Sequence, residues 1–270
     1  MTTHRTVAAL RTALAPARAK ARIGLVPTMG ALHAGHEALI RAAREECDLV
    51  VASIFVNPAQ FGAHEDLERY PRDLERDAGL AEAWGVDHLF VPSVSEMYPP
   101  GFETWVEVEG LADVLEGAGR PGHFRGVATV CLKLFNIVRP DAAYFGRKDA
   151  QQAALVQQLA RDLDLELEIR VVPTVRDADG VALSSRNAYL APDEREAAGA
   201  IPRALEAGAE AYRRRQDPAS AAHAVLGEEP LLEPEYVEVA RLDGRLYLLA
   251  AVRIGTTRLI DNVVLDGEQP

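Results

Sequence analysis

Two histidines lie three residues apart in a short glycine-containing segment, and this spacing suits phosphate binding. The segment runs from Pro27 to His36, follows a short apolar run and opens a helical pattern. Gly30 and Gly35 remove side chains where a phosphate would approach the backbone. Amides at the start of a helix attract anions, and the imidazoles of His33 and His36 can donate hydrogen bonds to phosphate oxygens. The segment therefore predicts an anion site at the start of this helix.

Other interpretations of the same segment remain open. The two histidines could mark a surface helix start, a turn without a ligand or part of a metal site, although no acidic or cysteine ligand stands at the usual spacing. The segment is not a P-loop.

A G-x-G-x-x-G pattern at Gly117, Gly119 and Gly122 follows a helical run and contains Pro121. Since a dinucleotide fingerprint follows a strand, we interpret this pattern as a flexible loop, with Arg120 as a candidate anion contact.

A lysine and a later serine-arginine segment could add charge to the phosphate site. Lys148 follows a predicted strand and can reach phosphates, or it can be an ordinary solvated lysine. Asp149 next to it could cap the following helix. Small hydroxyls and Arg186 in the segment 183–187 suit a mobile phosphate clamp, or an ordinary polar loop between domains.

Two glutamines could orient a small acid. A neutral amide binds a carboxylate or hydroxyl through hydrogen bonds without placing a full positive charge on it. The carboxylate then stays more nucleophilic than it would beside an arginine. Gln60 could instead belong to turn chemistry after Asn-Pro, and Gln152 could be an exposed helix residue.

The first two-thirds of the chain alternates apolar, strand-like runs with helical patterns. Runs of buried strands separated by helices predict a Rossmann-like α/β domain, a parallel sheet with helices on both faces. Ligands bind beyond the carboxyl ends of the strands in such folds. Expected strands span 23–27, 49–56, 87–92, 142–145 and 169–175, and expected helices span 36–46, 67–84, 127–138 and 150–163.

The last third has a different pattern. Two helical segments at 191–215 and 219–226 precede three strand-like runs at 236–241, 246–252 and 258–265. Asp243-Gly244 predicts a hairpin turn between the first two strands. The sequence thus predicts a Rossmann-like domain over residues 1–176 and a smaller α+β domain over residues 177–270.

Composition excludes several classes of protein. Hydrophobic residues make up 48% of the 270 residues and charged residues 26%, which is typical of a globular protein. The net charge of −12 argues against coating of nucleic acid or anionic lipid. Cys47 and Cys131 form no CxxC pair, and the sequence has no apolar run long enough for a membrane span, so we expect a cytoplasmic protein. The basic, acid-free first 22 residues resemble a transit peptide or form an amphipathic first helix.

The His33-Ala34-Gly35-His36 element resembles the HxGH signature of the nucleotidyltransferase superfamily that includes class I aminoacyl-tRNA synthetases. The ordered set of motifs resembles one family within it, the pantothenate synthetases, over essentially the whole chain. The matching segments are Thr28–His33, Gly35-His36, Ser53–Pro58, Gln60-Phe61, Tyr70–Arg72, His123–Val127, Phe145-Gly146, Lys148-Asp149, Gln151-Gln152, Leu183–Asn187 and Ile260–Asn262.

This resemblance implies an ATP-dependent ligase that joins pantoate to β-alanine through a pantoyl adenylate, releasing pyrophosphate and then AMP. It implies Mg²⁺ on the phosphates and a homodimer, and it places His33, His36 and Lys148 in catalysis. Gln60 and Gln152 are implied to bind pantoate, Gln60 also to bind β-alanine, and Asp77 to bind metal. The implied ATP contacts are Met29, Gly30, Ala31, Leu32, His33, Ala34, Gly35, His36, Gly146, Arg147, Lys148, Asp149, Val175, Leu183, Ser184, Ser185 and Arg186. The C-terminal domain is implied to supply a lid and flap.

Two positions depart from the family pattern, and two rival functions remain. Arg147 stands where an acidic residue is common, and Leu183 stands where methionine is frequent. One rival is a nucleotidyltransferase that releases pyrophosphate and leaves the nucleotide on its substrate. The other is a nucleotide sensor without catalysis, in which the last third of the chain binds a partner.

Overall fold

The computed structural model of the protein describes residues 1–63 and 65–266. Its chain divides into two compact units. The first comprises residues 1–146 and 155–172, and the second comprises residues 147–154 and the chain from Pro173 onward. The expected boundary at residue 176 lies close to Pro173, whereas the sequence pattern does not indicate that 147–154 groups with the second unit. The lid and flap roles of the second unit remain predictions.

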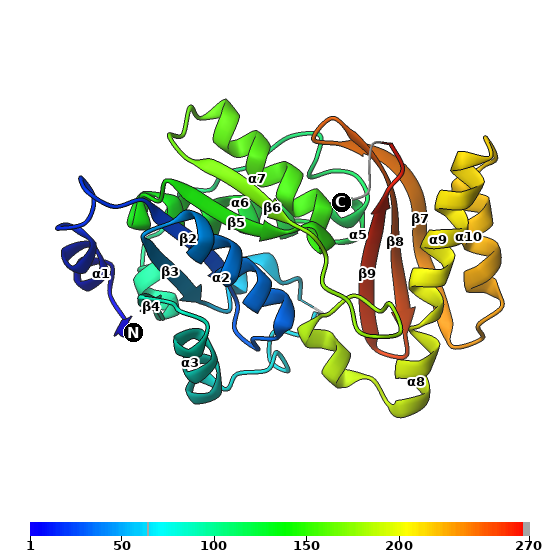
Figure 1. Ribbon diagram of the computed structural model, residues 1–270, viewed down its shortest axis with the longest axis horizontal. Coiled ribbons are helices and arrows are strands. Elements are labelled where there is room, and N and C mark those ends of the chain that lie inside the picture. Colours follow the sequence, from blue (N-terminus) through cyan, green and yellow to red (C-terminus); the bar gives the residue numbers. More distant parts are fainter. Residues whose placement is uncertain (64, 267–270) are drawn as a thin grey trace. The chain divides into compact units, whose positions relative to one another are not determined.

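The first unit is built on a six-stranded sheet in which every neighbouring pair of strands is parallel. The sheet with its helices confirms the predicted Rossmann-like α/β class (Figure 1). The strand order is β1-β4-β3-β2-β5-β6, so β2 and β3 lie at the centre. The strands are β1 (Thr2–His4), β2 (Ile23–Thr28), β3 (Leu49–Ile54), β4 (His88–Phe90), β5 (Ala142–Gly146) and β6 (Glu168–Val172).

Helices connect these strands. Helix α2 packs against β2, β3 and β5, and its side chains Leu39 and Ile40 share a buried core with Val50, Leu89 and Tyr144. Helix α6 packs against β2 and α1. The helices are α1 (Val7–Leu14), α2 (Ala34–Glu46), α3 (Leu74–Ala83), α4 (Val94–Met97), α5 (Glu116–Gly119), α6 (His123–Val138) and α7 (Ala150–Asp162), with 3₁₀ turns η1 (Pro58–Gln60) and η2 (Arg147–Asp149).

The expected helix over 67–84 is too long at its start. Helix α3 begins at Leu74, where the Asp73 side chain accepts a hydrogen bond from the Arg76 amide and caps the first turn. Pro71 stands just before this cap, and a proline disfavours helical conformation at the residue before it. Residues 67–73 therefore form an irregular segment that belongs to a pocket wall.

The second unit contains the predicted three-stranded antiparallel sheet. Asp243 and Gly244 both have positive φ, 46° and 84°, which confirms the tight hairpin turn. The expected helix over 191–215 is interrupted near Gly199 and becomes two helices. The elements are η3 (Ser185–Tyr189), α8 (Pro192–Ala197), α9 (Ala200–Arg213), α10 (Pro218–Gly227), β7 (Leu232–Leu242), β8 (Arg245–Ile254) and β9 (Thr257–Val264).

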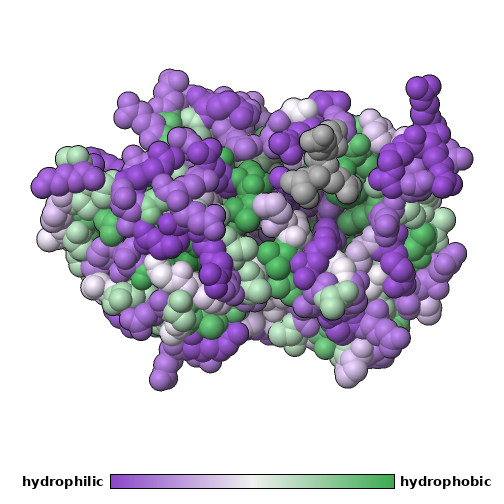
Figure 2. All heavy atoms as spheres, viewed as in Figure 1, coloured by the Kyte–Doolittle hydropathy of each residue, from purple (hydrophilic) through white to green (hydrophobic). Residues whose placement is uncertain are grey.

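The surface carries no extended apolar area on the face seen in Figure 2, where hydrophilic side chains dominate and hydrophobic ones form small separate groups. Scattered apolar residues of this kind are normal on a protein surface. Within residues 1–63 and 65–266, no helix has both the length and the apolar character that crossing a bilayer requires.

Candidate active site

The chain leaves the carboxyl end of β2 through a tight turn. The Thr28 hydroxyl donates to Ser53 O at 2.6 Å and accepts from Gly30 N at 3.2 Å. Gly30 and Ala31 have successive positive φ angles of 88° and 51°. An alanine in this left-handed region costs roughly 1–2 kcal/mol, so the surroundings must hold the turn in place.

A buried carboxylate contacts this turn. Asp77 is 1% exposed, and it accepts from Ala31 N at 2.7 Å and from Leu32 N at 2.9 Å. An added Cβ at Gly30 would lie 3.0 Å from Asp77 Oδ2, so glycine is required there by space as well as by φ. The Arg76 guanidinium lies 3.4 Å from Asp77 Oδ1. The expected metal role of Asp77 remains a prediction, and the observed oxygens lie on backbone amides.

The two histidines form the start of α2. His33 is the N-cap, and its Nδ1 accepts from Gly35 N at 3.1 Å. His36 Nδ1 accepts from His33 N at 3.3 Å, and the two ring centroids lie 4.2 Å apart. A ring nitrogen that accepts carries no proton, so each neutral imidazole bears its proton on Nε2. Both histidines therefore present an Nε2–H donor.

Gln60 ends the turn η1, and its amide is oriented by neighbours. Gln60 Oε1 accepts from Asn57 Nδ2 at 3.0 Å, while Gln60 Nε2 donates to Met29 Sδ at 3.2 Å. Asn57 also donates to Gly126 O at 3.2 Å and accepts from the Tyr98 hydroxyl at 2.8 Å. The Asn57 amide nitrogen can only donate, so the Gln60 atom that it contacts must be the carbonyl oxygen. The amide nitrogen of Gln60 therefore faces Met29.

Helix α6 supports Gln60 by close backbone contact. An added Cβ at Gly126 would overlap Ala59 O and lie 2.7 Å from Gln60 Cα, so only glycine permits this approach. His123 Nδ1 lies 2.8 Å from Gln60 O, and Arg120 Nη1 lies 3.1 Å from His123 Nε2. Since arginine donates, His123 is neutral and donates from Nδ1 to the carbonyl. Burial, and then the charge of Arg120, lower the pKa of His123 to about 4.

Lys148 lies in η2 of the second unit, and Asn262 holds the backbone around it. Asn262 Nδ2 donates to Arg147 O and to Lys148 O, both at 2.9 Å. Lys148 Nζ lies 3.8 Å from Asp149 Oδ2, and its side chain is 19% exposed. The second unit thus fixes the lysine backbone through one buried amide on β9.

The expected serine-arginine loop is tied at its start within the second unit. Leu183 N donates to Val175 O at 3.0 Å, which joins two residues expected to bind ATP. Ser184 caps η3 by accepting from Arg186 N at 3.3 Å. Asp261 pairs with Arg176 through both carboxylate oxygens, at 2.6 and 3.0 Å. The remaining expected residues are partly exposed, namely Gly146 at the end of β5, Gln152 on α7 and Ser185 on η3, while Ala34 at the start of α2 is exposed.

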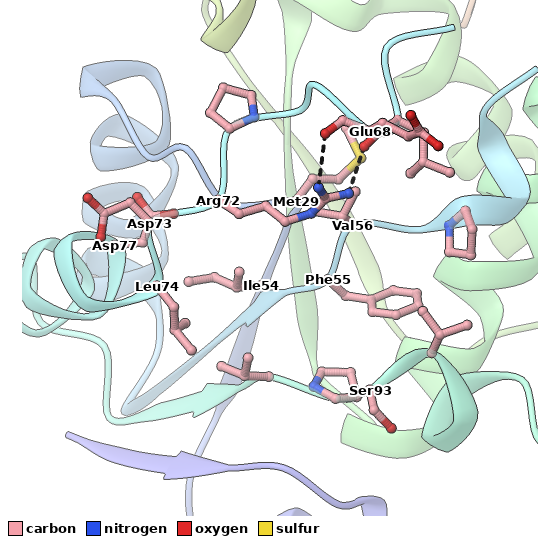
Figure 3. Close-up of a pocket in the computed structure, with 17 residues that line it drawn as sticks. Met29, Ile54, Phe55, Val56, Glu68, Arg72, Asp73, Leu74, Asp77 and Ser93 are labelled. Atoms are coloured by element: carbon pink, nitrogen blue, oxygen red, sulfur yellow. Dashed lines mark hydrogen bonds between the residues drawn. The ribbon is translucent and has the colours of Figure 1, made fainter. Parts of the chain in front are cut away.

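A pocket of about 670 Å³ lies behind the β2 turn in the first unit. Its walls include apolar side chains such as Ile54 and Phe55 (Figure 3), and Met29, Gly30 and Asp77 also line it. Arg72 donates to Leu67 O at 2.6 Å and to Glu68 O at 3.4 Å, drawn as dashed lines in Figure 3. The turn therefore borders open space on this side.

Sequence reasoning missed the residues that orient the site. Asn57, His123 and Gly126 belong to matched motifs but were given no role, and their signal was only their place in those motifs. The amide of Asn262 gave no signal of contact with Lys148, 114 residues away. In the described part of the chain, no three His, Cys, Asp or Glu side chains gather in a way that could hold a metal ion.

Comparisons with known proteins agree on one family. The family model described as pantoate-beta-alanine ligase matches residues 2–264. The chain is similar to the pantothenate synthetase of Moorella thermoacetica, with 53% identity over 97% of each chain. It is 56% identical to that of Roseiflexus castenholzii over 90% of this chain and 92% of that one.

Two solved structures are similar over nearly the whole chain. The pantothenate synthetase of Thermus thermophilus has a TM-score of 0.94 and 47% identity, covering 98% of this chain and 99% of that one. A Francisella tularensis pantoate-beta-alanine ligase, complexed with beta-gamma ATP and beta-alanine, has a TM-score of 0.84 and 36% identity, covering 99% of each chain.

Proposed function

The chain belongs to the pantoate–β-alanine ligase family, and from this premise we propose that it condenses pantoate with β-alanine at the expense of ATP. A pantoate carboxylate oxygen attacks the α-phosphorus of ATP, the bond to the bridging oxygen breaks, and pyrophosphate leaves. The β-alanine amine then attacks the pantoyl carbonyl carbon, and AMP leaves with the oxygen that joined the two groups. The ATP-complexed Francisella relative, similar over nearly the whole chain, supports ATP as the substrate.

The observation that carries the proposal is the pair of oriented imidazoles at the start of α2. Negative charge grows on phosphate oxygens as the α-phosphorus is attacked, and fixed donors stabilise that charge best. His33 and His36 accept backbone hydrogen bonds at Nδ1, so their Nε2–H groups are the donors we assign to phosphate. Lys148 adds a full positive charge in this proposal. The substrate carboxylate is the nucleophile, so catalysis needs no serine or cysteine nucleophile.

The remaining turn and loop residues complete the nucleotide site in this proposal. Residues 29–36 and 146–149 contact the phosphates and ribose, Val175 contacts the base, and 183–186 close over the phosphates as a flap. The close tie between Val175 and Leu183 supports a common role for these two segments. Arg147 replaces an expected acid; burial raises the pKa of Asp243, and the charges of Arg245 and, least of all, Arg147 oppose that rise.

Gln60 is assigned to both pantoate and β-alanine, and Gln152 to pantoate. The support for Gln60 is that Asn57 occupies its carbonyl oxygen, which leaves the amide nitrogen, now on Met29, as the group we assign to the substrate. An amide N–H can bind the pantoate carboxylate or hydroxyl without placing a positive charge beside the attacking oxygen, which therefore stays nucleophilic.

Mg²⁺ would arrive on the phosphates of ATP. The described side chains form no cage of three or more metal ligands, and both oxygens of Asp77 lie on backbone amides. These residues do not fit a dedicated magnesium site within the protein. Mg²⁺ commonly keeps several waters and binds substrate phosphates, so the reaction does not require such a cage.

A homodimer in the cytoplasm completes the proposal. Both cysteines are buried free thiols, as expected where the cell keeps thiols reduced. Light scattering on the purified protein tests the dimer, since the chain mass is 29.3 kDa and a dimer doubles it.

The proposal is tested by measuring AMP release with pantoate and β-alanine supplied separately and together. We expect steady AMP release and pantothenate only when both are present. A nucleotidyltransferase would release pyrophosphate and keep the nucleotide on its product. A sensor would bind ATP in a calorimeter without turnover, and either result rejects the proposal.

A further inference from the structure

We infer that Asp77 is a positioning residue for nucleotide activation, acting through the backbone turn that carries the two histidines. Asp77 lies on α3, 46 residues along the chain from Ala31, whose amide it binds. The inference rests on the proposed function, because that proposal assigns the histidines to phosphate. Asp77 itself touches the turn, and we give it no contact with the substrate.

The turn has the shape of an anion-binding nest. Successive residues with unusual φ direct neighbouring N–H groups toward one point, where an anion binds. At Gly30 and Ala31 both φ angles are positive, and the amides of Ala31 and Leu32 converge on the Asp77 carboxylate at 2.7 and 2.9 Å. The protein thus fills this nest with its own carboxylate. The phosphates must therefore find donors beyond these two amides, which points to the histidine side chains.

Packing alone does not hold the turn. The pocket of about 670 Å³ is lined by Gly30 and by Asp77, which Figure 3 labels, so part of the turn borders open space. Ala31 is held in a left-handed conformation that an alanine leaves when it is released. Leu32 leads directly into His33, the N-cap of α2, so a shift of the turn moves the histidine that begins the helix.

The hydrogen bonds of Asp77 distinguish a role in positioning the turn from a role in binding a metal ion. Each Asp77 oxygen accepts from a backbone N–H, and a cation beside them would meet the positive ends of those same groups. If Asp77 positions the turn, its replacement slows the chemistry without changing the Mg²⁺ concentration at half-maximal rate. If Asp77 binds the metal, its replacement raises that concentration.

The test compares Asp77→Asn with Asp73→Asn in the full-length protein. Asp73 caps the same helix and lines the same pocket, and its side chain accepts from Arg76 N rather than from the turn. The readouts are pantoate-dependent exchange of pyrophosphate into ATP, the Mg²⁺ concentration at half-maximal rate, the KM for pantoate, and hydrogen exchange of the amides of residues 29–36.

For Asp77→Asn we expect the exchange rate to fall about 10–100-fold, the size of effect that misplacing a catalytic group produces. The KM for pantoate and the half-saturating Mg²⁺ should stay within about twofold, because positioning leaves both binding events intact. At least one of the Ala31 and Leu32 amides should exchange about tenfold faster or more, since asparagine offers one acceptor oxygen where the carboxylate offers two. Asp73→Asn should change none of these readouts.

The inference is overturned if the two amides keep their protection, if added Mg²⁺ restores the rate of Asp77→Asn, or if Asp73→Asn slows the rate equally. Should Asp77→Asn fail to fold, Asp77→Glu carries the same prediction, because it keeps the charge and displaces the oxygens. Amide protection is measured without turnover. A wild-type protein that makes no pantothenate would therefore reject the proposed function while leaving the contact between Asp77 and the turn measurable.

Discussion

The backbone N–H of His33 donates to Nδ1 of His36 across 3.3 Å, so the second histidine is oriented by the residue that caps its own helix. His33 repeats the arrangement, with Nδ1 accepting from Gly35 N. In each ring one nitrogen is committed to the backbone, and the other carries the proton that we assign to the phosphates.

Replacing His33 by asparagine separates its two tasks. Asparagine is a good N-cap and can accept from Gly35 N, so the free energy of unfolding should stay within about 1 kcal/mol of wild type. The Nε2–H donor is lost, so the rate of pantoate-dependent pyrophosphate exchange should fall by roughly 10²–10³. Chemical denaturation and isotope exchange measure the two effects on one preparation.

His33→Ala is the matched comparison. It removes the cap as well, so it should lose an additional stability of about 0.5–2 kcal/mol with a similar loss of rate. An asparagine variant that exchanges pyrophosphate at the wild-type rate would remove His33 from catalysis.

Gly126→Ala should damage Gln60 through the backbone. A methyl group there would overlap Ala59 O, so η1 must move. We expect a loss of about 1–3 kcal/mol in the free energy of unfolding, as for other overpacked sites. We also expect a KM for pantoate raised more than the KM for ATP, because Gln60 is assigned to pantoate. Steady-state kinetics with each substrate varied in turn checks this.

Gly119→Ala is the control, because an added Cβ there meets nothing within 4 Å. It should leave both KM values unchanged. Equal effects of the two substitutions would show that Gly126 has no special relation to Gln60.

The fold was more predictable from sequence than the supports of the site. Buried strands such as Leu49–Ile54 carry their pattern locally, as does the Asp243-Gly244 turn, so both were predicted. The strand Thr2–His4 was missed, because three residues are too few to show a period. Helix α3 was predicted seven residues too early, because charged residues continue the helical pattern through Pro71.

Contacts between distant segments had no sequence signal. The metal role expected for Asp77 comes from the family resemblance alone, and its hydrogen bonds from Ala31 and Leu32 depend on how α3 meets the turn. The dependence of Gln60 on Gly126 likewise arises from the packing of a helix that lies much later in the chain. Side-chain types indicated the chemistry, and tertiary packing decided which residues hold it in place.

Asn262→Ala should loosen the Lys148 backbone. Asn262 is 4% exposed, and it supplies the donor for two carbonyl groups, which lose that partner in the variant. Leaving a buried carbonyl group unpaired costs about 1–3 kcal/mol, and less where it is partly buried as here, so the second unit should unfold earlier. We expect the exchange rate to fall about tenfold, because the charge on Lys148 is no longer held in position. Thermal unfolding and isotope exchange check both parts.

The exposed Asn136 on α6 provides the control for this substitution. Asn136→Ala should retain the wild-type rate and melting temperature. An Asn262→Ala protein with unchanged kinetics would mean that Lys148 needs no support from β9.

Acid should destabilise the first unit through His123. Its pKa is about 4 in the folded protein, because of burial and the charge of Arg120, against 6.5 when unfolded. Between these values the unfolded chain binds more protons, so the stabilisation is complete above pH 6.5 and is lost as the pH falls toward 4. From pH 7.5 to pH 5 the free energy of unfolding should drop by about 2 kcal/mol from this group.

Denaturant unfolding of wild type and His123→Gln at several pH values isolates this contribution. The pKa values of His4 and His88 are also lowered by burial, which adds a slope of the same sign to both proteins. The variant should therefore keep a shallower dependence on pH. Parallel curves for the two proteins would assign the acid sensitivity to other groups.

The most direct test of the central claim follows the carboxylate oxygens of pantoate labelled with ¹⁸O. If the carboxylate attacks the α-phosphorus and AMP later leaves from the pantoyl carbon, one labelled oxygen must end on AMP. Mass spectrometry of the products with β-alanine and ATP present should find AMP carrying one ¹⁸O and pyrophosphate carrying none. Unlabelled AMP, or label in inorganic phosphate beside ADP, would contradict the account.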